Sequence, residues 1–116
     1  MRYERFIEDV KGLEFIADDA TADSAVKAVL GILASSIEES RARKLTESLP
    51  DPLTFDKLRG RQRRIIMTPP DVYVTEIADQ FNISREQAHR LIERVLETAK
   101  EAVGGLLDEY ELLRAS

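Results

Sequence analysis

The side chains best suited to chemistry in this sequence gather after Ser84, where a helix is expected. Arginine side chains bind phosphates and guanine edges, glutamine bonds adenine, and histidine donates hydrogen bonds. On the outward side of a recognition helix, such residues read DNA in the major groove. The candidate DNA-contacting side chains of this helix are Arg85, Gln87, His89, Arg90 and Arg94. Three arginines nearer the middle of the chain would add phosphate contacts, namely Arg61, Arg63 and Arg64.

Residues 74–92 have the spacing of a helix-turn-helix. Ala78 is a small residue inside the first predicted helix, and Asn82 follows four positions later, where a tight turn needs positive φ. After one apolar residue, Ser84 and Gln87 form a capping box in which each side chain bonds the other residue's backbone amide. The pattern predicts a helix-turn-helix-like hairpin.

The charge of the second helix argues against DNA binding. Residues 84–103 contain four basic and four acidic side chains, so their net charge is zero. Most affinity for nucleic acid comes from neutralising phosphates. A helical hairpin with a short turn also gives this sequence pattern for packing reasons alone, so both interpretations stay open.

No residue pattern predicts catalysis or a metal site. His89 is the only histidine, no Ser or Thr is visibly paired with it, and there is no cysteine. Asp18, Asp19 and Asp23 lack the alternating ligand spacing and closing glutamate of a calcium loop. Gly104-Gly105 is not followed by the Lys-Ser/Thr of a phosphate-binding loop. We therefore expect no enzymatic activity, no metal and no cofactor.

Composition predicts a single soluble domain of 116 residues, large enough to bury a core. The net charge is −5, yet residues 41–64 hold eight basic and three acidic side chains, a local charge of +5. This basic strip would bind phosphates, pair with acidic surfaces of the same protein, or simply be solvated. The absence of cysteine, of a secretory signal and of a long apolar run favours the cytoplasm.

Apolar periodicity predicts helices throughout the chain. The first half should hold helices at residues 2–11, at 22–37 with Thr21 as N-cap, and at 40–48. A short helix capped by Thr54 should follow, and Thr68-Pro69-Pro70 should act as a stop. In the second half, helices are expected at about residues 74–81, at 84–103, ended by Gly104-Gly105, and at 106–114.

The chain contains one hairpin pattern twice. Residues 24–30 recur as residues 90–96, an offset of 66 residues, and a short amphipathic segment precedes each run. We predict an all-α, compact helical bundle of two pseudo-repeated hairpins. In this single domain, residues 1–116, the first repeat is 1–50, the basic join is 51–71 and the second repeat is 72–116. Val29 and Val95 should both be buried.

Nearly the whole chain resembles the uncharacterised prokaryotic family DUF2267, domain of unknown function 2267. The segments that carry the resemblance are residues 1–10, 25–33, 42–50, 74–78, 84–96 and 111–116. The resemblance implies an all-helical, duplicated domain with no established activity or cofactor, so no functional residue is transferred. The sequence departs from the family pattern in the basic residues 59–64 and in ending at Ser116, where the first copy continues.

Together these patterns predict a non-catalytic binding or assembly module. Its partner would be a protein, including a second copy of the chain, because the two long helices have broad apolar and small-residue faces. The alternative is a DNA-binding regulator that uses the helix after Ser84. Nothing indicates a membrane or a small-molecule substrate.

Overall fold

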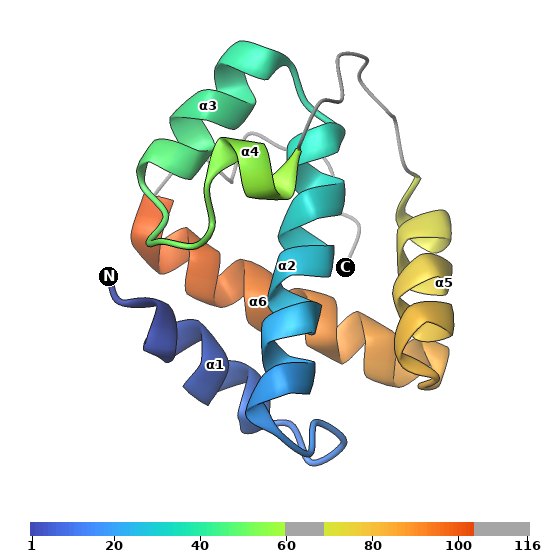
Figure 1. Cartoon of the computed structure of the whole chain (residues 1–116). Coiled ribbons are helices and arrows are strands. Elements are labelled where there is room, and N and C mark those ends of the chain that lie inside the picture. The colour runs from blue at the N-terminus through green and yellow to red at the C-terminus, as the bar shows by residue number, and fades with distance from the viewer. Residues whose placement is uncertain (60–68, 104–116) are drawn as a thin grey trace.

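The computed structural model describes residues 1–59 and 69–103, and every regular element in these ranges is an α-helix. The all-α prediction is confirmed. Figure 1 shows the arrangement. The helices are α1 (Tyr3–Lys11), α2 (Asp19–Ser35), α3 (Glu39–Glu47), α4 (Phe55–Leu58), α5 (Pro70–Phe81) and α6 (Arg85–Val103).

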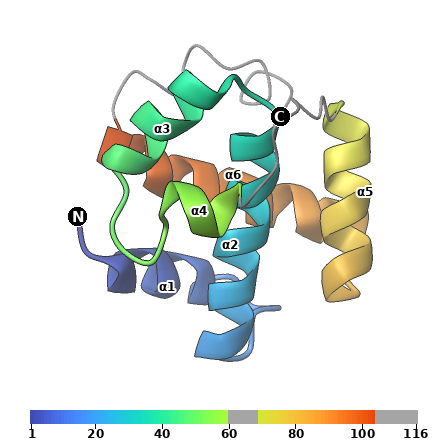
Figure 2. The ribbon, with the colours of Figure 1, turned by 45° about the horizontal axis from the view of Figure 1, so that its top comes forward.

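Two long helices form the centre of the fold. In both views α6 crosses behind α2, while α1 and α5 lie on opposite sides of the crossing (Figures 1 and 2). α3 and α4 cover the second half of α2. Val29 and Val95 are fully buried, as predicted. The other fully buried side chains of these two helices are almost all aliphatic: Ala22, Ala25, Val26, Leu30, Leu33, Ala34, Ala88, Leu91 and Ala99.

At the N-termini of α2 and α6, a side chain accepts a hydrogen bond from the amide three residues later. The Asp18 carboxylate accepts from the Thr21 amide at 2.7 Å, so the prediction of Thr21 as N-cap was wrong. Ser84 and Gln87 form the predicted capping box, with both hydrogen bonds at 3.0 Å. The two helices therefore begin 66 residues apart, at Asp19 and Arg85. Internal duplication stays a prediction, which this equivalence supports.

The hairpin of α5 and α6 differs from expectation at its start. Pro70 is the first residue of α5, four residues before the predicted helix, because proline fits a first helical turn that needs no amide donor. The C-terminal end of α5 agrees with the predicted turn at Asn82. Asn82 has a φ of 53°, and its amide donates to the Ala78 carbonyl. α6 runs to Val103, where the described range ends.

α4 and α5 both pack closely against α2. A Cβ on Gly31 would lie 3.2 Å from the Leu58 carbonyl oxygen, so the glycine permits the close approach of α4. The predicted Thr54 cap of α4 is confirmed by a 3.2 Å bond from the Lys57 amide. The buried Tyr73 hydroxyl of α5 donates to the Val29 carbonyl at 2.5 Å.

Some predicted features lie outside the described residues. These are the basic residues Arg61, Arg63 and Arg64, the stop residue Thr68, the helix end at Gly104-Gly105 and the last helix, 106–114. Within the described ranges, no helix combines the length and apolarity needed to cross a bilayer.

Candidate nucleic-acid interface and its surroundings

The predicted interface begins at the N-terminus of α6, where Arg85 and Gln87 contact their own hairpin. The Arg85 guanidinium bonds the Thr75 hydroxyl of α5 and lies 3.5 Å from the Asp71 carbonyl oxygen. The Gln87 side chain is engaged in the capping box. Gln87 therefore stabilises the helix start, while Arg85 remains exposed at the surface.

His89 forms a pair within α6. Its Nδ1 lies 3.3 Å from a carboxylate oxygen of Glu93, one helical turn later, and both side chains are about two-fifths exposed. A histidine in this position is a surface residue beside an acid.

Arg90 ties α6 to the loop between α1 and α2. Its two terminal nitrogens donate to the two Glu14 carboxylate oxygens at 2.7 and 3.0 Å. The guanidinium also lies 5.5 Å from the centre of the Phe15 ring, a cation–π distance. The hydrogen bond from Arg90 lowers the pKa of Glu14 to about 2, and the same bond raises the pKa of Arg90. This predicted phosphate ligand already holds a carboxylate in bidentate geometry.

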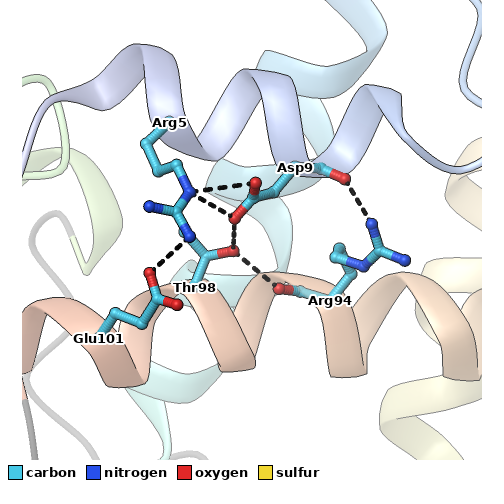
Figure 3. A network of polar contacts seen from close by, with 5 residues as sticks. All are labelled: Arg5, Asp9, Arg94, Thr98 and Glu101. Carbon is cyan, nitrogen blue, oxygen red and sulfur yellow. Dashed lines mark hydrogen bonds and ion pairs between the residues drawn. The ribbon is translucent and has the colours of Figure 1, made fainter.

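Arg94 contacts the C-terminus of α1. Its guanidinium donates to the Asp9 carbonyl oxygen at 2.9 Å, as Figure 3 shows. A cation at this point interacts favourably with the negative end of the helix dipole. A Cβ on Gly12 would lie 3.1 Å from the same guanidinium, so glycine leaves room for it. Arg94 thus helps to end α1 as well as to join it to α6.

The Arg94 contact is part of a polar network that joins α1 and α6 (Figure 3). The Asp9 carboxylate accepts from Arg5 at 3.1 Å and from the Thr98 hydroxyl at 2.6 Å. Arg5 also pairs with Glu101 at 2.8 Å. Thr98 is only 2% exposed, so its hydroxyl needs such an acceptor. Sequence reasoning missed this network, because the partners that join the two helices lie 85 to 96 residues apart along the chain.

The outward side of α6 is centred on acidic residues. Glu86, Glu93 and Glu97 are separated by seven and four positions, which places them on one face of the helix. Glu86 and Glu97 are exposed and Glu93 is partly exposed. We call these three residues the acidic ridge. Arg90, four positions after Glu86, lies directly beside the ridge and is held by Glu14. Arg94 lies further round the helix, where α6 meets α1.

Two arginines of the basic strip contact neighbouring parts of the fold. Arg43 pairs with Glu39 at 3.2 Å and lies 4.1 Å from the centre of the Phe55 ring. Arg59 is 6% exposed and donates to the Ile37 carbonyl at 3.0 Å. These two arginines of the strip therefore stabilise the packing of α3 and α4.

An open groove of about 450 Å³ lies between α1 and the start of α2. The Tyr3 hydroxyl donates to Asp23 at 2.5 Å, and Asp23 also pairs with Lys27 at 3.0 Å. Burial and the neighbouring Asp23 raise the pKa of Tyr3. The remaining lining residues are Glu4, Ile7, Glu8, Lys11 and Asp19.

No group of three or more histidine, aspartate or glutamate side chains in residues 1–59 and 69–103 is placed to hold a metal ion.

Comparison with known proteins gave no match among curated proteins or solved structures. One family profile, described as uncharacterized conserved protein, matches residues 3–110. By this match over nearly its whole length, the chain belongs to the DUF2267 family.

Proposed function

We propose that this chain is a non-catalytic helical binding or assembly module whose partner is a protein, including a second copy of itself. The observation that carries the proposal is the acidic ridge of Glu86, Glu93 and Glu97 on the outward side of α6. The ridge occupies the surface that a recognition helix would turn toward DNA.

Electrostatics favour a protein partner at this surface. A phosphate backbone that approached α6 along its exposed face would meet the three carboxylates of the ridge, and like charges raise the cost of contact. The ridge instead complements basic side chains, which proteins supply. The overall charge of −5 acts in the same direction.

The positions of the arginines support the same conclusion. To reach phosphates, Arg90 would have to give up two hydrogen bonds to Glu14, and Arg94 would have to leave the end of α1. Exchanging these partners for a phosphate gains little net free energy, since each guanidinium already has acceptors. Arg85, in the first turn of α6, is exposed and bonds the Thr75 hydroxyl of its own hairpin.

The absence of catalysis is part of this proposal. His89, the only imidazole in the sequence, lies beside Glu93 on the exposed side of α6. A general base needs the proton of a nucleophile or substrate within hydrogen-bond reach. The neighbour of His89 is the Glu93 carboxylate instead, so we propose no catalytic role for this histidine. We also propose that the module acts in the cytoplasm. A chain without cysteine forms no disulfides and so has no need of an oxidising compartment.

DNA binding is the second candidate, and one observation favours it. The turn between α5 and α6 has the left-handed Asn82 and the N-capping Ser84 that the helix-turn-helix pattern predicts. In this alternative, Arg85 and Arg90 would contact DNA, and Arg61, Arg63 and Arg64 would contribute phosphate contacts.

Two double variants separate the candidates. Glu86→Gln with Glu97→Gln removes charge from the acidic ridge, and Arg85→Ala with Arg90→Ala removes two exposed cations from the first half of α6. Circular dichroism first establishes that both variants are folded. Light scattering over about 1 to 100 µM protein then measures self-association in the micromolar range, and a gel shift with mixed genomic fragments measures DNA retention.

The two candidates predict opposite results. If a protein partner binds the ridge, the glutamine variant loses association and the alanine variant keeps it. If DNA binds, the glutamine variant retains more DNA and the alanine variant retains less. A wild-type chain that stays monomeric over this range contradicts self-association, whereas DNA retention that depends on the arginines contradicts the proposal as a whole.

A further inference from the structure

We draw no further inference here: the strongest candidate, the open groove between α1 and the start of α2, rests on a cluster of acidic side chains at which no second observation points to a ligand.

Discussion

Replacing Arg94 by methionine tests whether this arginine has a structural role. The substitution keeps the apolar stem and removes the guanidinium that donates to the Asp9 carbonyl at 2.9 Å. A hydrogen bond from a charged group contributes about 1.5–3 kcal/mol. The lower end applies here, because Arg94 is only partly buried and the Asp9 carbonyl also accepts from the Gly12 amide at 3.3 Å.

We therefore expect Arg94→Met to lower the free energy of unfolding by about 1.5 kcal/mol. For a domain of this size the midpoint of thermal unfolding falls by roughly 4 to 8 °C. Urea and thermal denaturation followed by circular dichroism measure both quantities.

Arg2→Met is the matched control, since it removes the same group from a side chain that is 86% exposed. Its effect should stay within about 0.5 kcal/mol, as for other surface substitutions. Equal stability of the wild type and Arg94→Met would refute the assignment of Arg94 to the end of α1.

Three further changes test other contacts. Tyr73→Phe removes the buried hydroxyl that binds α2, and urea denaturation should show a loss of about 1 kcal/mol; no loss would mean that the hydroxyl does not pin α5. Ser84→Ala removes the N-cap of α6 and should cost about 1 kcal/mol in the same assay; unchanged stability would contradict the capping role of Ser84. Arg90 depresses the pKa of Glu14 from 4.5 to about 2, so its stabilising effect is complete above pH 4.5 and is lost as the pH falls toward 2. The wild type should therefore be more stable than Glu14→Gln at pH 6, and the difference should shrink over that acidic interval; a difference that does not change with pH would contradict the ion pair.

The core and the start of α6 were predictable because local patterns determine them. The stripe that contains Val95 repeats at helical spacing, and the capping box fixes the start of α6 to a single residue. Local pattern did not settle the start of α2, where Asp18 and Thr21 are both good capping residues. The carboxylate of Asp18 reaches the Thr21 amide, so the helix begins earlier than predicted.

The roles of the arginines were not predictable from spacing alone. Helical periodicity correctly indicated that Arg90 and Arg94 lie away from the buried stripe. It could not indicate that Glu14 and Asp9, which lie 76 and 85 residues earlier, would face them. Such pairs arise from the packing of α1 and its loop against α6. A side chain outside the buried stripe can therefore face a neighbouring element instead of a ligand.

The central claim, that the outward side of α6 meets protein rather than nucleic acid, is tested most directly by a gel shift with mixed genomic fragments. At about 50 mM salt and about 1 µM wild-type protein, conditions under which specific DNA-binding proteins retain their sites, we predict that all fragments migrate as free DNA. Retention that weakens steeply at about 200 mM salt and disappears in the Arg85→Ala, Arg90→Ala variant would contradict the account.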